Sequence, residues 1–140
     1  MFQLYSKACE YALLALIAAG VDGRPRFRAA DVCEWTGIPE PYTRKVLQSL
    51  VRGGFLDAER GPGGGYSLTR GPEKVSILEV VKAVDGGTAF DNCIMGFPKC
   101  GSDNPCPLHD TWTGVKERLV GDLEKLTLRD AIDVAKAREE

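Results

Sequence analysis

The stretch GIPEPYTRKVLQSLVRGGFLDAERGPGGGYSLT, residues 37–69, decides the fold. Its first half, residues 39–54, opens with prolines, which helix starts tolerate, and closes with two glycines, which commonly end a helix. The spacing predicts a helix with a buried apolar stripe, which consists of Tyr42, Val46, Leu47, Leu50 and Val51. The other side of this helix is then an exposed basic face, which consists of Thr43, Arg44, Lys45, Gln48, Ser49 and Arg52.

A shorter helix is expected just before this one. The segment AADVCEWTG, residues 29–37, places Ala29, Val32 and Trp35 roughly on one side and ends at Gly37. A short helix, the turn TGIP and a helix with a basic outer face form the layout of a helix-turn-helix, whose second helix enters the major groove of DNA. A solvated surface helix is the alternative that this feature alone leaves open.

The second half of the stretch predicts a β-hairpin. The segments GFLDAE, residues 54–59, and YSLT, residues 66–69, alternate apolar and polar side chains, and RGPGGG joins them with three consecutive glycines. Glycine-rich loops that bind phosphate lie between a strand and a helix, whereas this loop lies between two strands, so a nucleotide site is disfavoured. A hairpin directly behind the second helix of a helix-turn-helix is a wing.

The bulk composition suits one compact domain, or a small domain with an appended element. The chain has 140 residues, of which 44% are hydrophobic and 27% are charged. Its net charge is -2, but residues 24–70 carry eight Lys or Arg against five Asp or Glu, so mild overall acidity does not exclude a nucleic-acid partner. The most apolar run, YALLALIAA at 11–19, is too short to span a bilayer and lacks signal-peptide flanks. We therefore expect a cytoplasmic protein with no membrane partner and no small-molecule substrate.

Helices are also expected on both sides of the central stretch. Residues 6–20 predict a buried helix capped by Ser6, and residues 76–86 predict another, in which Ser76 and Glu79 form a capping box. A long helix follows, with an apolar seam of Trp112, Val115, Leu119, Leu123 and Leu126. This seam is expected to pair with the same helix of a second chain, and packing against its own domain is the alternative. A last short helix, capped by Thr127, completes the chain.

The segment NCIMGFPKCGSDNPCPLH, residues 92–109, brings together metal-binding residue types. Cys93, Cys100, Cys106 and His109 are spaced C-x6-C-x5-C-x2-H, and flexible segments fill the gaps. Soft thiolates select iron-sulfur clusters, zinc or copper(I), and structural zinc sites usually have closer cysteine pairs. An iron-sulfur cluster is the leading interpretation. Zinc, or an empty site that uses free thiols, is the alternative.

The other cysteine chemistries receive less support. Five cysteines in a cytosolic chain do not suggest a disulfide framework, and an odd number leaves one unpaired. A cysteine-based redox enzyme is disfavoured because there is no C-x-x-C motif and no separate base near the thiols other than His109. Cys9 and Cys33 lie within apolar helices, so they are expected to be buried and inert.

The helix-turn-helix, the motif RGPGGGYSL and the three-cysteine cluster together resemble the IscR/NsrR-type (Rrf-two) family of bacterial transcription regulators, over residues 5–128. The resemblance implies a mainly α fold with a small hairpin wing. A winged helix-turn-helix domain would span residues 1–86, a cluster-binding loop residues 87–109, and a dimerisation helix with a tail residues 110–140. It also implies a homodimer on palindromic double-stranded DNA. The expected DNA contacts are Tyr42, Thr43, Arg44, Lys45, Arg60, Gly63 and Gly64.

By the same resemblance, an iron-sulfur cluster of the two-iron or four-iron type would control operator binding. The expected function is a DNA-binding repressor that senses redox state, nitric oxide or iron-sulfur supply. The alternative is the same fold with a structural zinc or with no cofactor. Cys93, Cys100 and Cys106 leave a fourth ligand to find, for which the resemblance offers His109 or, from the partner chain, Glu10. The first cysteine gap is one residue longer than in most members of the family, which leaves the cluster type open.

Overall fold

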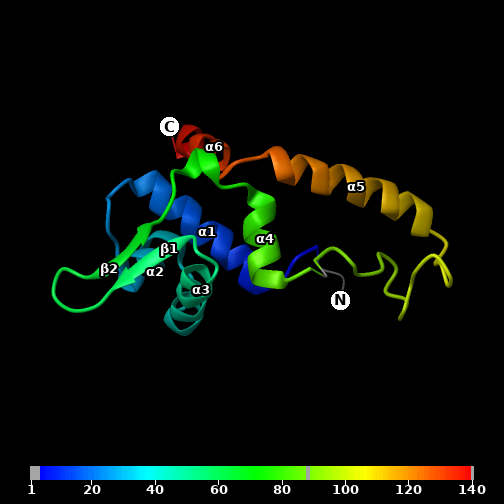
Figure 1. Cartoon of the computed structure of the whole chain (residues 1–140), viewed down its shortest axis with the longest axis horizontal. Helices are drawn as coiled ribbons and strands as arrows, with labels where there is room; N and C mark the ends of the chain where they lie inside the picture. Colours follow the sequence, from blue (N-terminus) through cyan, green and yellow to red (C-terminus); the bar gives the residue numbers. More distant parts are fainter. Residues whose placement is uncertain (1–3, 88, 140) are drawn as a thin grey trace.

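The computed structural model describes residues 4–87 and 89–139. Those residues form six α-helices, a short 3-10 helix and one antiparallel two-stranded sheet. The elements in order are α1 (Lys7–Asp22), α2 (Ala29–Thr36), α3 (Glu40–Arg52), β1 (Leu56–Glu59), β2 (Gly65–Leu68), η1 (Pro72–Lys74), α4 (Ile77–Asp85), α5 (His109–Lys125) and α6 (Leu128–Glu139). Most of them gather into a body around α1, while α5 extends away with the cysteine segment beside it (Figure 1).

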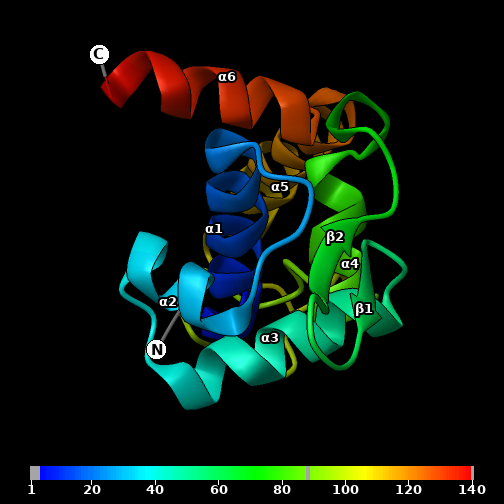
Figure 2. The same cartoon turned by 90° about the vertical axis from the view of Figure 1, so that its left-hand side faces the viewer.

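Helix α1 is the centre of the body. The Ser6 hydroxyl caps its start by accepting a hydrogen bond from the backbone N–H of Cys9 at 3.1 Å, as predicted. The helix contacts α2, α3, α4 and α6, which explains why its sequence is apolar on most sides. It runs past Gly20, where we expected it to end, and is capped by Gly23, which has a φ of 81°. Gly20 has a packing role instead, because a Cβ at this position would collide with the Ile132 side chain of α6. Helix α6 accordingly lies across the end of α1 (Figure 2).

The helix-turn-helix and the wing form as predicted. Gly37 takes a left-handed conformation, with φ of 78°, and turns the chain between α2 and α3. Strands β1 and β2 pair antiparallel, from Leu56 opposite Leu68 to Glu59 opposite Gly65. Phe27 adds a third backbone segment, because it exchanges two hydrogen bonds with Tyr66, at 2.9 and 2.7 Å. The wing is thus joined to the segment that links α1 to α2.

The face of α3 differs from the prediction in its first turn. Tyr42, expected in the buried stripe, is 54% exposed, and Thr43, expected on the outer face, is 1% exposed. The Thr43 hydroxyl lies within hydrogen-bonding distance of the backbone carbonyls of Ile38 and Pro39, at 3.3 and 3.2 Å. A threonine can satisfy its hydroxyl on the carbonyl four residues earlier, so a polar residue fits the buried junction between α2 and α3.

The chain returns to the body after α5. Ile77 at the start of α4 donates a backbone hydrogen bond to Leu126 at 2.9 Å, and Leu128 donates one to Val75 at 2.8 Å. Ser76 and Glu79 form the predicted capping box of α4. These contacts fix the C-terminal end of α5 beside α4. The rest of α5 extends from the body at this point.

The predicted seam on α5 is not one continuous exposed stripe. Trp112 is 7% exposed, and Leu119 and Leu123 pack partly against the core of their own chain. Val115 and Leu126 remain exposed, at 53% and 41%. The expectation that the seam faces a second chain is therefore wrong for Trp112, which is buried within its own chain. For the other four residues it stays a prediction, although α4 packs against α5. Among the described residues, no helix has both the length and the apolar character needed to cross a bilayer.

Candidate metal centre and nucleic-acid interface

Three cysteine sulfurs meet in the loop before α5. The Sγ atoms of Cys93, Cys100 and Cys106 all lie within 4.8 Å of one another. Tight turns bring them together: the backbone N–H of Gly96, which has a φ of 82°, donates to the Cys93 carbonyl at 3.0 Å. The backbone N–H of Cys106 points at the Cys100 sulfur at 3.4 Å. The glycine in the first gap therefore allows a chain reversal that other residues resist.

His109 is the first residue of α5 and lies at the edge of this group. Its Nδ1 atom is 3.6 Å from the Cys100 sulfur. It is not among the residues whose ligand atoms all lie within 4.8 Å of one another. The start of a helix favours negative charge, so the beginning of α5 suits neighbouring thiolates. The structure thus brings together all four predicted residues, with three sulfurs converging and the imidazole flanking one of them.

The three thiols do not share one environment. Burial raises the pKa of the Cys93 thiol, but hydrogen bonds to the backbone of Phe97 and Met95 outweigh this effect and lower the pKa to about 7. Burial, with added contributions from the neighbouring thiols of Cys93 and Cys100, raises the pKa of Cys106. In the metal-free chain Cys93 is therefore the more readily ionised of these two thiols. Ligation at Cys106 would have to release a proton.

The spacing and softness of these donors fit a metal. Sulfurs bound to a single tetrahedral ion, with bonds of about 2.3 Å, lie about 3.8 Å apart. Thiolates on the irons of a cluster are spread more widely. The three sulfurs, all within 4.8 Å of one another, are close to the spacing for a single ion and would have to move apart to hold a cluster. Soft thiolate ligands favour iron-sulfur clusters and zinc over magnesium or calcium.

The other candidate ligands lie outside this group. Glu10 is exposed on α1, where it pairs with Lys7 at 3.3 Å. Cys9 is 0% exposed, and burial, together with the Asp85 carboxylate, raises its pKa to about 12, as expected for an inert thiol. Cys33 was expected to be buried but is only partly so, and its thiol contacts the Thr43 hydroxyl at 3.4 Å between α2 and α3.

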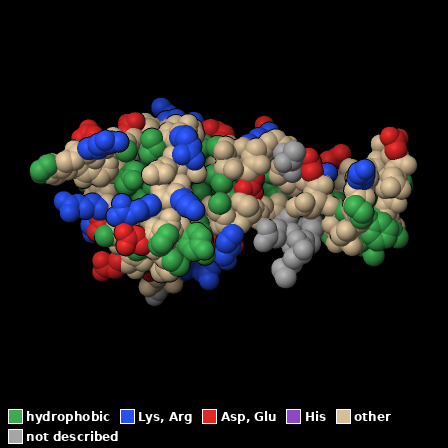
Figure 3. Space-filling view, turned by 90° about the horizontal axis from the view of Figure 1, so that it is seen from below, with side chains coloured by type: hydrophobic (Ala, Val, Ile, Leu, Met, Phe, Trp, Pro, Cys, Tyr) green, Lys and Arg blue, Asp and Glu red, His purple; other side chains and the backbone are tan. Residues whose placement is uncertain are grey.

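The second site is a basic surface made by α3 and the wing. Tyr42, Arg44, Lys45 and Arg60 are all exposed there. A groove of about 430 Å³ separates helix and wing, and its polar lining includes Gln48, Arg52, Glu59, Arg60 and Tyr66. Lys and Arg side chains gather over this part of the body in the space-filling view (Figure 3). Such a helix and wing can enter a groove and hold the flanking phosphates of a duplex.

The wing is held by Arg26, a residue that no motif in the sequence marks. Arg26 donates to the Gly63 carbonyl at 2.9 Å and forms an ion pair with Glu59 at 2.9 Å. A side chain at Gly64 would collide with the Glu59 carbonyl, and Gly63 has a φ of 76°. These two glycines are therefore needed for the shape of the loop. Gln48 and Arg52 lay on the predicted outer face of α3, but their place in the groove depends on the wing.

Known proteins resemble this chain in both sequence and fold. The sequence matches the family described as Rrf2, iron-dependent transcriptional regulator, over residues 5–134. The chain belongs to the Rrf2 family. It is 33% identical to the HTH-type transcriptional regulator IscR of Klebsiella pneumoniae (strain 342) over 104 residues, which cover 74% of this chain and 63% of that protein.

Solved structures of other regulators share the fold. CymR, described as the global cysteine regulator of B. subtilis, superposes with a TM-score of 0.76 at 18% identity, over 96% of this chain and 98% of that one. T. potens IscR superposes with a TM-score of 0.74 at 22% identity, over 96% and 90%. These matches confirm the winged helix-turn-helix with its C-terminal helix. The Rrf2 chain is a transcription regulator and not an enzyme, as predicted.

Proposed function

We propose that this Rrf2 regulator is a homodimeric repressor whose affinity for a palindromic operator is set by an iron-sulfur cluster in the cysteine loop. The observation that carries the proposal is the convergence of the Cys93, Cys100 and Cys106 sulfurs within 4.8 Å. The family description, which names iron dependence, supports the cluster. The sequence similarity to IscR supports it as well. When bound, such a cluster supplies a centre that responds to oxidants, nitric oxide or iron-sulfur supply.

The protein ligands would be the three cysteines and one further residue. His109 is the favoured fourth ligand, because its Nδ1 atom already lies 3.6 Å from the Cys100 sulfur. Glu10 could serve only from a second chain, since it is not part of the group within its own chain. Its exposed carboxylate, held only by a surface ion pair with Lys7, is free to do so.

The DNA-reading surface would be the exposed side of α3 together with the wing. Tyr42, Arg44 and Lys45 would face the major groove, and Arg60, presented by Gly63 and Gly64, would reach the backbone or the minor groove. The Thr43 side chain has no part in this surface because it is buried. A twofold dimer would place two such surfaces on the two half-sites of a palindrome.

Paired ligand variants test the cluster. After anaerobic purification, the wild-type protein should be coloured and should contain iron and acid-labile sulfide. Cys93→Ala, Cys100→Ala or Cys106→Ala should abolish both, because each removes a soft, negatively charged ligand. His109→Ala should shift the visible spectrum and shorten the lifetime of the colour in air, while Glu10→Ala should do neither. The reverse pattern would assign the fourth ligand to Glu10 of the partner subunit.

A structural zinc is the second candidate, because the sulfur spacing suits a single tetrahedral ion as well. A colourless protein with one zinc per chain, lost in the cysteine variants, would establish it and overturn the cluster. A protein with neither metal would leave free thiols as the sensing groups. Operator affinity, measured with and without the metal at fixed salt, then shows whether the site controls DNA binding.

A further inference from the structure

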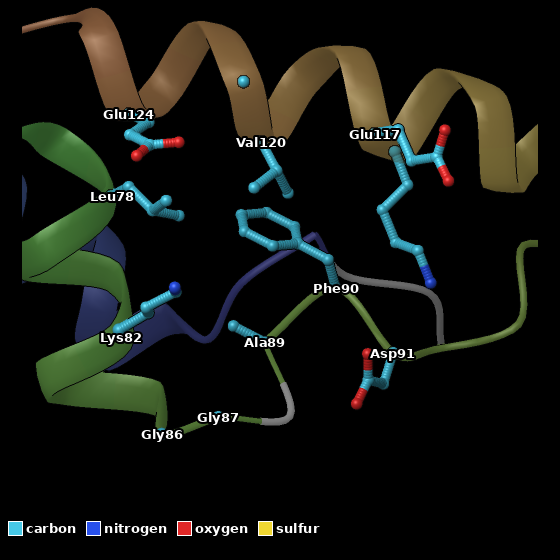
Figure 4. Close-up of a pocket in the computed structure, with 12 residues that line it drawn as sticks. Leu78, Lys82, Gly86, Gly87, Ala89, Phe90, Asp91, Glu117, Val120 and Glu124 are labelled. Carbon is cyan, nitrogen blue, oxygen red and sulfur yellow. The ribbon is translucent and has the colours of Figure 1, made fainter.

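The residues just before Cys93 are anchored in the core. Phe90 is 3% exposed, although it follows a glycine-rich turn and precedes an exposed loop. Its ring meets that of Tyr5 edge to face, with centroids 6.4 Å apart and planes at 85°. It points between α4 and α5, towards Leu78 and Val120 (Figure 4). A buried ring therefore fixes the chain three residues before the first cysteine.

The backbone at Phe90 is held in a conformation that a bulky residue avoids. Its φ is 71°, in the left-handed region that favours glycine. Such a conformation persists only where the surrounding packing imposes it, and it is found mostly at functional sites. The ring burial supplies that packing here. Figure 4 shows the consequence, because Phe90 enters the space between the helices while the next residue, Asp91, points away from it.

A second anchor acts on the residue that precedes Cys93. The indole Nε1 of Trp112, in the first turn of α5, donates to the Asn92 carbonyl at 3.0 Å. Trp112 is 7% exposed, and a buried indole N–H needs such an acceptor. His109 lies three residues earlier on the same helix, so the two side chains share one face. One turn of α5 thus holds the chain before Cys93 and places an imidazole beside Cys100.

We propose that Phe90 and Trp112 are positioning residues for Cys93, which set its sulfur at the distance that Cys100 and Cys106 require. The inference rests on the thiolate metal site proposed above. Neither side chain would touch the metal. Both anchors are contacts of side chains that are not ligands, an aromatic packing and an N–H···O bond, so they would order the loop independently of the metal and lower the entropy cost of binding it. Outer residues of this kind typically change metal affinity by about 10–100-fold when they are replaced.

Titration of the reduced, metal-free, full-length protein with Co²⁺ alone tests the assignment. Cobalt bound by thiolates gives visible bands whose intensity reports the geometry and the number of sulfurs. Trp112→Phe removes the N–H and keeps a ring, so it should weaken Co²⁺ binding about tenfold and alter the bands. Trp35→Phe is the matched control, because Trp35 packs against Phe27 and Arg24 in the body and should leave both quantities unchanged.

A second pair of variants covers the other anchor and guards against a folding effect. Phe90→Leu removes the buried ring and should also weaken binding, whereas Phe27→Leu removes an equally buried ring, 3% exposed, that packs against Trp35 in the body, and should not. Thermal melting of the metal-free variants shows whether the body stays folded. Wild-type affinity and band shape in both Trp112→Phe and Phe90→Leu would overturn the proposal, and an effect in only one would remove the other residue from it. A wild-type protein without thiolate bands would instead overturn the metal site itself.

Discussion

Tyr11 of α1 packs against Tyr42 of α3, with ring centroids 6.1 Å apart and planes inclined by 50°. Tyr42 is the exposed aromatic residue of the proposed DNA-reading helix, and the Lys7 ammonium lies 5.3 Å from the centroid of the Tyr11 ring. Helix α1 therefore supports the DNA-reading surface from one side. Ser6, the N-cap of α1, donates two hydrogen bonds to the Asp85 carboxylate of α4. One comes from its backbone N–H at 2.7 Å and the other from its hydroxyl. The start of α1 thus touches both the DNA-reading helix and the end of α4 that leads into the cysteine loop.

Replacing Tyr11 should weaken operator binding through Tyr42. An aromatic pair contributes about 0.5–1.5 kcal/mol beyond its buried area, so Tyr11→Ala should lower affinity about two- to tenfold. Fluorescence anisotropy at fixed salt measures the change. If Tyr11 acts by orienting Tyr42, the double variant Tyr11→Ala/Tyr42→Ala should bind no worse than Tyr42→Ala alone. Additive losses would show that Tyr11 contributes independently of Tyr42.

Arg60 should contribute to DNA affinity without contributing to stability. Its side chain is exposed at the wing loop and forms no ion pair with another described residue. Arg60→Ala should therefore reduce operator binding and make the dependence of affinity on salt shallower by about one unit per subunit, while the melting temperature stays the same. Arg138→Ala removes the same charge from the far end of α6 and is the control. Equal binding by the two variants would exclude the wing from the interface.

Val115 offers a sharper test of dimerisation than the leucines of the predicted seam. It is 53% exposed on α5, so Val115→Arg should leave the folded chain intact and yet place a charge in the proposed interface. The variant should be monomeric by light scattering and should lose tight binding to a palindrome. Val134→Arg, at a 61% exposed position of α6, makes the same change elsewhere and should remain dimeric. A dimeric Val115→Arg protein would place the interface away from this side of α5.

Gly20 should be needed for the packing of α6 on α1. An added Cβ would collide with the Ile132 side chain, so Gly20→Ala should destabilise the fold by about 1–3 kcal/mol despite the better helix propensity of alanine. Denaturant unfolding measures the loss. Ile132→Ala makes room and should lessen the effect of the glycine substitution when the two are combined. Gly114→Ala, where no atom lies within 4 Å of the added Cβ, should instead raise stability by up to about 1 kcal/mol.

Local patterns explain why much of the fold could be predicted. The helix periodicity, the caps at Ser6 and Ser76, the turn at Gly37 and the three glycines of the wing all act over a few residues, so the printed order of the chain contains them. The spacing of Cys93, Cys100 and Cys106 likewise indicated a shared centre. The predicted burial of Tyr42 and exposure of Thr43 used periodicity alone and was wrong. Both residues lie in the first turn of α3, where turn contacts decide which side chains are buried.

By itself, then, the sequence determined the order and type of the elements and the chemistry available to the loop, because hydrogen-bonded turns and amphipathic faces are local properties. Only the tertiary structure decided which contacts join distant segments. Arg26 reaches the wing across 37 residues of sequence, and Trp112 reaches the carbonyl before Cys93 across 20. The first pair follows from the pairing of the α1–α2 link with the wing, and the second from the packing of α5 beside the cysteine loop. Two residues that lie far apart in the sequence share no periodic pattern, so the sequence does not indicate that they are in contact.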